Sequence, residues 1–165
     1  MTIRKQLLTK PKAGRPNIPG YGISENRKGL LPWKWAEGLL SETQNYFLAT
    51  VRKDGRPHIM PIWGVWFDSA FYFSTGKNSV KARNLEANPN CVLCPGGADE
   101  AVIVEGTAEK LVDKKKLAKF AKVYFDKYNW EILKMNEPVF VVRPRTVFGH
   151  IEETFQKTAT RWTFD

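Results

Sequence analysis

The segment spanning residues 73–90 carries the residue types and spacing best suited to chemistry. A predicted strand ends in Ser-Thr-Gly at residues 74–76, and a predicted helix opens at residues 78–79. Hydroxyl groups, the free backbone N–H groups of a helix start and a cation in the first turn, Lys81, are the groups that bind a phosphate. An ordinary capped helix, with Lys81 and Arg83 in solvent, would show the same pattern, so the residues by themselves leave both interpretations open.

Nucleophilic and metal chemistry find little support in the sequence. The only histidines, His58 and His150, are isolated, and there is no G-x-S-x-G, Walker A or G-x-G-x-x-G motif. A catalytic triad is therefore not indicated. Cys91 and Cys94 form a single C-x-x-C, but their segment is typical of a strand interior, and zinc would require further ligands. We expect two buried thiols and no metal, and we name no catalytic side chain.

The net charge of +9 is concentrated at one end of the chain. Residues 1–34 hold eight Lys and Arg against one Glu, whereas the remaining residues hold 18 basic and 16 acidic side chains. Prolines and glycines without periodicity predict a basic, extended arm over residues 1–27, followed by one domain over residues 28–165. Such an arm suits nucleic acid or an anionic surface, but more often it solubilises the chain or wraps a partner subunit. Nucleic acid is therefore not the partner we expect.

The apolar runs are too short to cross a bilayer, and no apolar core of signal-peptide length follows Met1. We therefore expect a cytoplasmic location and no membrane span.

Hydrophobic periodicity indicates the elements that must position these residues. Asp-Gly within residues 53–56 predicts a hairpin turn, and Asn78 and Asp113 are predicted N-caps. The predicted strands are 45–52, 57–67, 70–74, 90–94, 101–110 and 139–151, and the predicted helices are 33–43, 79–87 and 114–128. Six mainly antiparallel strands with flanking helices indicate an α+β, barrel-like domain.

Three motifs in a fixed order give a more specific indication. They are G-R-P-H-I-M-P-I-W-G-V-W, then F-Y-F-S-T-G-x-x-S-V-K-A-R-N-L-E-A-N-P, then V-E-G-T-A, and the sequence closes with T-R-W-x-F. Together, over roughly residues 33 to 164, the chain resembles the flavin and deazaflavin oxidoreductases related to pyridoxamine 5′-phosphate oxidase. The resemblance implies an FMN-binding split β-barrel that forms a homodimer, with the cofactor sites at the subunit interface.

The same resemblance implies which residues bind the cofactor. The second strand would run beside the isoalloxazine ring, contacting it largely through backbone groups of His58, Met60, Pro61, Ile62 and Trp63. The strand-to-helix turn would hold the ribityl chain and the phosphate through Ser74, Thr75, Ser79, Lys81 and Asn84. Many relatives carry an arginine where Ser79 stands, so this chain offers one phosphate cation fewer than the family pattern.

The function implied by the resemblance is hydride transfer to or from a small organic substrate. FMN and coenzyme F-420 both fit, because F-420 users share the W-G-V-W and T-R-W-x-F pieces whereas FMN binding is the broader trait of the superfamily. The cofactor would supply the chemistry, and the protein would supply binding and orientation. Other function classes stay open: a non-catalytic flavin-binding or sensor module, a haem-handling split barrel using His58 or His150, and a basic RNA-binding β-barrel.

Overall fold

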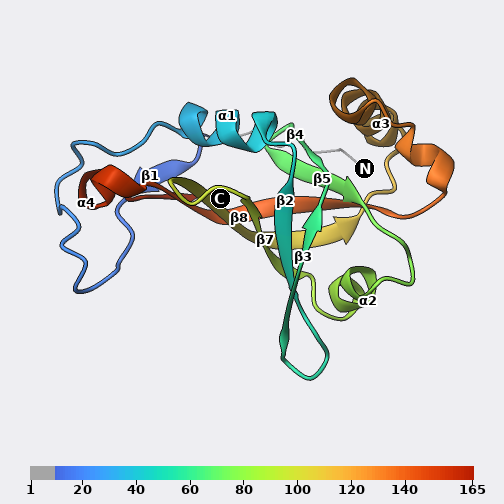
Figure 1. Cartoon of the computed structure of the whole chain (residues 1–165), viewed down its shortest axis with the longest axis horizontal. Helices are drawn as coiled ribbons and strands as arrows, with labels where there is room; N and C mark the ends of the chain where they lie inside the picture. Colours follow the sequence, from blue (N-terminus) through green and yellow to red (C-terminus); the bar gives the residue numbers. More distant parts are fainter. Residues whose placement is uncertain (1–9) are drawn as a thin grey trace.

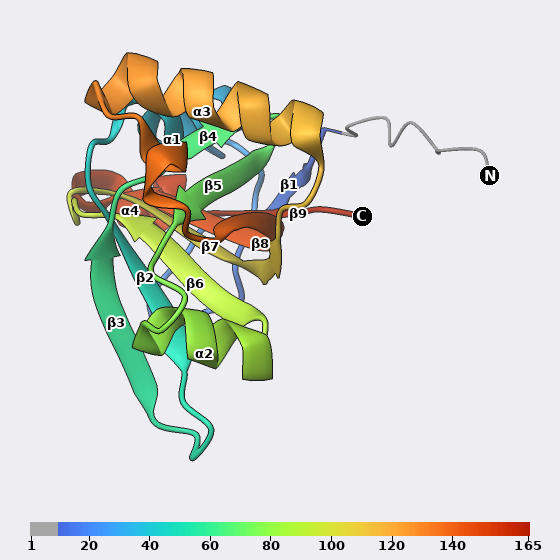
Figure 2. The same cartoon turned by 90° about the vertical axis from the view of Figure 1, so that its right-hand side faces the viewer.

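The computed structural model describes residues 10–165, and Figures 1 and 2 show it from two directions. The first nine residues of the predicted arm lie outside the described residues. The strands are β1 (Lys12–Gly14), β2 (Tyr46–Val51), β3 (Pro57–Ile62), β4 (Val65–Phe67), β5 (Ala70–Ser74), β6 (Asn90–Pro95), β7 (Glu100–Lys110), β8 (Val139–Ile151) and β9 (Thr160–Thr163). The helices are α1 (Trp33–Glu42), α2 (Val80–Ala87), α3 (Lys114–Tyr128), η1 (Ile132–Met135), η2 (Glu152–Thr154) and α4 (Phe155–Thr158).

The strands form one sheet in which neighbouring strands are antiparallel, in the order β1-β9-β8-β7-β6-β2-β3. The long strand β8 connects the parts of the sheet, because β5 pairs with the first part of β8 and β9 pairs with its second part. A register shift between Glu105 and Gly106 bends the β7–β8 pair. Only glycine fits at this bulge, since a Cβ on Gly106 would lie 2.3 Å from the Arg143 carbonyl oxygen. The predicted α+β, antiparallel architecture is confirmed.

The predicted number of six strands is wrong, because residues 10–165 contain nine. The predicted strand 57–67 breaks at Trp63-Gly64 into β3, which pairs with β2, and β4, which pairs with β5. A Cβ on Gly64 would lie 2.2 Å from Phe71 Cζ, so the chain turns there at a point of very close approach. The other two additional strands, β1 and β9, are short and pair with each other.

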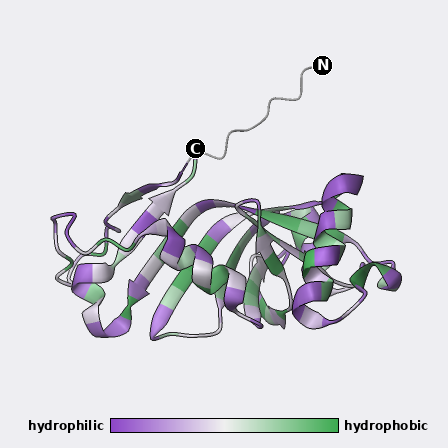
Figure 3. Cartoon of the chain, turned by 90° about the horizontal axis from the view of Figure 1, so that it is seen from above, coloured by the Kyte–Doolittle hydropathy of each residue, from purple (hydrophilic) through white to green (hydrophobic). Residues whose placement is uncertain are grey.

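Two apolar clusters hold helices against the sheet. The larger lies under α1 and includes Ala36, Leu40 and Phe71, and the smaller lies under α3 and includes Tyr72 and Phe120. β5 serves both, because successive side chains point to opposite faces of a strand. In Figure 3 the strands carry hydrophobic and hydrophilic colours in turn, and the helices also carry both. Asp113 caps α3 as predicted, accepting hydrogen bonds from the N–H groups of residues 115 and 116.

The described part of the basic arm lies against the end of the sheet. β1 pairs with β9, and Gly14 lies opposite Arg161. Arg15 donates hydrogen bonds of 2.7–2.9 Å to the backbone carbonyls of residues 26, 28, 157 and 159. One guanidinium therefore ties the arm to itself and to the segment around α4.

Candidate functional site

The start of α2 forms a cluster of hydroxyl groups. Ser79 is the N-cap, rather than the predicted Asn78, and its Oγ accepts a hydrogen bond of 3.1 Å from the Ala82 N–H. Thr75 Oγ1 lies 3.2 Å from the same Oγ. The two predicted residues are therefore brought together at the end of the helix where free N–H groups and the helix dipole favour an anion.

A buried polar chain connects α2 to the β2–β3 hairpin. Asn84 is only 6% exposed, and its Nδ2 donates to Thr50 Oγ1 over 2.9 Å. Thr50 Oγ1 lies 3.4 Å from His58 Nδ1. The side chains of Asn84 and His58 are thus brought close to one another through Thr50, and the buried Asn84 amide is held by the Thr50 hydroxyl.

Two cations, Lys81 and Arg52, act on the same place. Lys81 forms no ion pair within residues 10–165, whereas Arg52 also lies near the Asp54 carboxylate, whose pKa it helps to lower. Burial lowers the pKa of the Lys81 ammonium below its ordinary value. Burial is also the largest cause that lowers the pKa of His58, followed by the positive charges of Arg52 and Lys81. An ammonium that is partly removed from water and has no counter-ion is a site where an anion would be stabilised.

Ser74 lies at the rim of this cluster. Its Oγ donates a hydrogen bond of 3.0 Å to the Pro138 carbonyl oxygen, in the loop that leads into β8. The hydroxyl proton of Ser74 is therefore already engaged within the protein. Lys77, in the turn before α2, is held on the same side, because its N–H donates to Glu137 Oε2 over 2.7 Å. Figure 2 looks onto this region, with α2 below, η1 above and β3 along one side.

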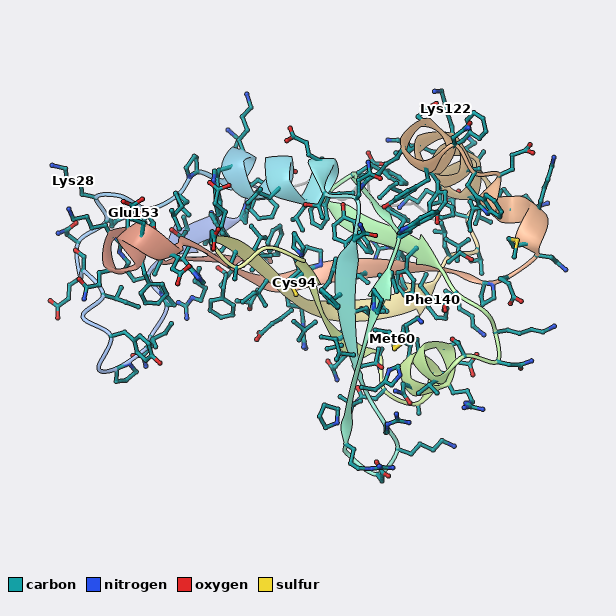
Figure 4. All side chains as sticks on the ribbon, in the orientation of Figure 1. Lys28, Met60, Cys94, Lys122, Phe140 and Glu153 are labelled. Atoms are coloured by element: carbon teal, nitrogen blue, oxygen red, sulfur yellow. The ribbon has the colours of Figure 1, made fainter. Side chains whose placement is uncertain are left out.

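The strand predicted to lie beside the ring, β3, is the last strand in the sheet order. It pairs with β2 alone among the described strands, so the backbone groups along its other edge are available to a ligand. Its side chains divide between two faces. His58, Met60 and Ile62 lie opposite residues 50, 48 and 46 of β2, on the side where α2 lies, and Figure 4 shows Met60 there. Pro61 lies on the other face, opposite Phe47.

Trp63 follows β3 and is held by the C-terminal end of α3. Its ring stacks on that of Tyr128, with the ring centroids 4.7 Å apart and an angle of 5° between the ring planes. Its Nε1 donates a hydrogen bond of 3.1 Å to Asn45 Oδ1. The Trp63 side chain remains 48% exposed, so it presents a flat aromatic edge beside the end of β3. Trp66, three residues later, is buried in the core, and only Trp63 of the two is therefore open to a ligand.

Lys127 secures the backbone at the same break. Its Nζ donates to the Gly64 carbonyl over 3.1 Å and to Tyr46 Oη over 2.8 Å. Tyr128 Oη also contacts Gly64, accepting from its N–H and donating to its carbonyl. Burial lowers the pKa of Lys127 to about 8.

Three contributors to this region were missed from the sequence: Thr50, Arg52 and the end of α3. The first two had a usable signal. The hairpin turn at 53–56 fixes the register of β2 against β3, which places Thr50 opposite His58 and Arg52 two residues further on the same face. Lys127 and Tyr128 contact residues 44–64, which are distant in sequence, so no local sequence pattern predicts these contacts.

Comparison with known proteins gives a consistent family match. The family described as pyridoxamine 5′-phosphate oxidase matches residues 34–150. No curated protein matches the chain. The conserved hypothetical protein Rv2991 from Mycobacterium tuberculosis is a similar structure, with 21% identity and a TM-score of 0.65 over 76% of this chain and 88% of that one.

Two further solved structures are similar in fold. One, an F-420 reductase, has 28% identity and a TM-score of 0.54 over 67% of this chain and 94% of that one. The other, a haem-binding protein from Mycobacterium smegmatis, has 19% identity and a TM-score of 0.60 over 73% of this chain and 55% of that one. These likenesses agree with the split-barrel architecture.

Proposed function

This chain belongs to the pyridoxamine 5′-phosphate oxidase family, and on that basis we propose that it is a flavin-type oxidoreductase. It uses FMN or F-420 to transfer hydride to or from a small organic substrate. The observation that carries this proposal is the pair of hydroxyl groups and the unpaired Lys81 ammonium at the start of α2, beside the open edge of β3.

The residues present suit the phosphate of such a cofactor. Ser79 and Thr75 offer hydroxyl groups, and Lys81 offers a charge with no carboxylate partner within residues 10–165. Position 79 carries no cation, and Arg52, whose positive charge helps to lower the pKa of His58, is a second cation on the same side. Asn84, bonded to Thr50, ties α2 to strand β2.

In the proposed mechanism the protein binds and orients, and the bound cofactor supplies the hydride-transfer chemistry. The backbone edge of β3 would hold the polar edge of the ring, with Met60 and Ile62 on the side of α2 and Trp63 at the end of the strand. Pro61 contributes through its carbonyl oxygen alone, because proline has no N–H. None of these residues is asked to transfer a proton, so no acid or base is named.

The choice between FMN and F-420 concerns the region beyond the phosphate. F-420 carries an acidic glutamyl tail, which would need further cations. The hairpin tip offers Arg52 and Lys53, whereas Arg56 already forms an ion pair of 2.8 Å with Asp54. The likeness to an F-420 reductase supports this cofactor, and the family description supports FMN.

The proposed enzyme is a homodimer that covers one face of the sheet. Phe47, Ile59 and Cys94 share that face, because Phe47 lies opposite Cys94 on β6 and next to the residue pair Ala49 and Ile59. Phe47 is 41% and Ile59 is 58% exposed, although both are large and apolar. Figure 4 shows Cys94 on the opposite side of β2 from Met60. In the proposed dimer the cofactor sites would lie where the two subunits meet.

Separate titrations of the purified protein with FMN, FAD, F-420 and haem test the proposal. Saturable binding of FMN or F-420, followed by hydride transfer with a reductant, is the expected result. Tight cofactor binding without turnover for any donor and acceptor would favour the sensor module. A Soret band that is lost on replacing His58 or His150 would favour haem handling, and nucleic acid retained through high salt would favour the RNA-binding barrel. The expected cytoplasmic location remains a prediction. Within residues 10–165, no helix is long and apolar enough to span a membrane.

A further inference from the structure

The break between β3 and β4 is held by a half-buried lysine from the last turn of α3. Lys127 Nζ donates hydrogen bonds of 3.1 Å to the Gly64 carbonyl oxygen and 2.8 Å to Tyr46 Oη. Tyr46 is fully buried, and its own Oη donates to the Leu40 carbonyl oxygen over 2.6 Å. The ammonium group of Lys127 therefore connects the break to β2 and, through Tyr46, to α1.

This ammonium group lies over two aromatic rings, 4.8 Å from the ring centroid of Tyr46 and 5.3 Å from that of Tyr128. Burial raises the pKa of both phenols, so both are neutral at pH 7 and neither cancels the charge. Lys122, on the same helix, pairs with Asp126, whereas Lys127 pairs with no carboxylate in residues 10–165. A half-buried, unpaired cation lowers stability relative to an apolar side chain of similar length. Packing alone therefore does not account for a lysine at this position.

The next residue of the helix, Tyr128, bonds to the same break. Its Oη accepts from the Gly64 N–H over 3.0 Å and lies 2.8 Å from the carbonyl oxygens of Gly64 and Gln44. A phenol has one proton, so Tyr128 can donate fully to only one of these two carbonyls at a time. Lys127 is the second donor that keeps the Gly64 carbonyl bonded. The ring of Tyr128 stacks on Trp63, so the two residues of α3 fix both the backbone and the indole at this point.

We propose that Lys127 is a positioning residue for the cofactor ring and acts through the indole of Trp63. By holding the Gly64 carbonyl, it fixes the backbone where Trp63 leaves β3, and so fixes the exposed indole beside the end of that strand. The ring would lie along β3, whereas the phosphate would lie at the start of α2. The inference rests on the proposed function and assigns the ring end of the cofactor site to α3.

Ligands with and without a phosphate separate an effect on the ring from an effect on the phosphate. The pair is FMN and riboflavin, or F-420 and its phosphate-free ribityl deazaflavin, according to which cofactor the wild-type chain binds. Lys127→Met should weaken both members by about fivefold, the effect of losing one ordinary hydrogen bond, because both contain the ring. Lys81→Ala should weaken only the member that carries the phosphate. Lys122→Met removes an exposed charge from the same helix and should leave both affinities unchanged.

Two further measurements distinguish positioning of Trp63 from a general structural effect. In the 15N-labelled chain without cofactor, Lys127→Met should shift the Gly64 N–H and Trp63 Nε1–H signals, and unchanged signals from β7 and β9 would show that the variant is folded. In a Trp63→Ala background, Lys127→Met should change the affinity for the ring by at most about twofold, because the side chain through which it acts is gone. A general loss of structure would weaken binding by the same factor in both backgrounds.

The outcomes separate this proposal from the proposed function. If the wild-type chain binds neither FMN nor F-420, the proposed function is wrong and the role of Lys127 is wrong with it. If the wild-type chain binds its cofactor, three results would overturn the positioning role alone: unchanged affinity in Lys127→Met, an unmoved Trp63 Nε1–H signal, or an undiminished effect of Lys127→Met in the Trp63→Ala background. Equal weakening of both ligands that disappears in the Trp63→Ala background supports the proposal.

Discussion

Lys81→Ala offers the most direct test of the phosphate site. Lys81 lies in the first turn of α2, where burial lowers the pKa of its ammonium, and no carboxylate among residues 10–165 compensates its charge. A bound phosphate would supply that compensation. Removal of the side chain should therefore cost one charge-assisted hydrogen bond, which contributes about 1.5–3 kcal/mol. The dissociation constant for FMN or F-420 should rise about 10- to 140-fold.

The assay is a fluorescence or calorimetric titration of each variant with the same cofactor. Arg83→Ala is the matched control, since Arg83 lies on the same helix, is exposed, and carries the same charge. A second readout is the titration of His58 by NMR. Lys81 is one of the charges that lower the pKa of His58, so this pKa should rise in Lys81→Ala. Unchanged cofactor affinity in Lys81→Ala, or an equal loss in Arg83→Ala, would refute the assignment of the phosphate site.

Three further predictions concern stability and accessibility. Gly64→Ala should lower the free energy of unfolding by about 3 kcal/mol in urea titrations, because its Cβ would lie 2.2 Å from Phe71 Cζ; a loss below about 0.5 kcal/mol would contradict the close approach. Burial lowers the pKa of Lys127 to about 8 in the folded protein, whereas an unfolded lysine has a pKa of about 10.4. Between these pH values the unfolded chain binds more protons than the folded protein, so the free energy of unfolding should rise with pH. Lys127→Met should lack this rise when urea midpoints at pH 7 and pH 9.5 are compared, and an identical rise in both proteins would refute it. Mass spectrometry should find alkylation at Cys94 before Cys91, because Cys91 is buried and burial raises its pKa to about 12. Cys94 lies on the proposed dimer face, so its labelling should slow as protein concentration rises; a rate independent of concentration would count against that face.

The sheet could be predicted from sequence wherever one local rule decided the structure. The Asp-Gly turn at 53–56 and the capping carboxylate of Asp113 are such cases, and both form as expected. The break at Gly64 could not be predicted in this way. The apolar pattern from Pro57 to Phe67 is continuous, and the strand ends only because another strand passes too close for a Cβ.

Some parts of the candidate site likewise follow from local sequence, and others depend on tertiary contacts. Thr75, Ser79 and Lys81 come from one short segment, so their proximity follows from a strand followed by a helix. Trp63 is different, because its ring is fixed by Tyr128 and Asn45, which are far from it in sequence. A local pattern reports residue types, whereas the orientation of a side chain depends on what tertiary packing brings against it.

Cys91 and Cys94 show how geometry settles a motif that spacing leaves open. The two residues lie three apart on β6, so they point to opposite faces of the sheet, with Cys91 in the core. A disulfide or a shared metal ion would require them to face each other. The prediction that the pair lies in a strand is confirmed. The prediction that both thiols are buried is wrong for Cys94, which is only half-buried because it points away from the core.

The pairing of β1 with β9 has a consequence for the order in which the chain folds. Their contact at Lys12 and Thr163 spans 151 residues, and the bond from Arg15 to residue 157 spans 142. During synthesis β1 therefore cannot pair until β9 has also been made. Closing so large a loop is slow and entropically costly, and it gains nothing until both ends are present. Docking of the arm should be the final event in folding of this domain, and protection of residues 12–28 from protease would report that the chain has been made and folded through β9.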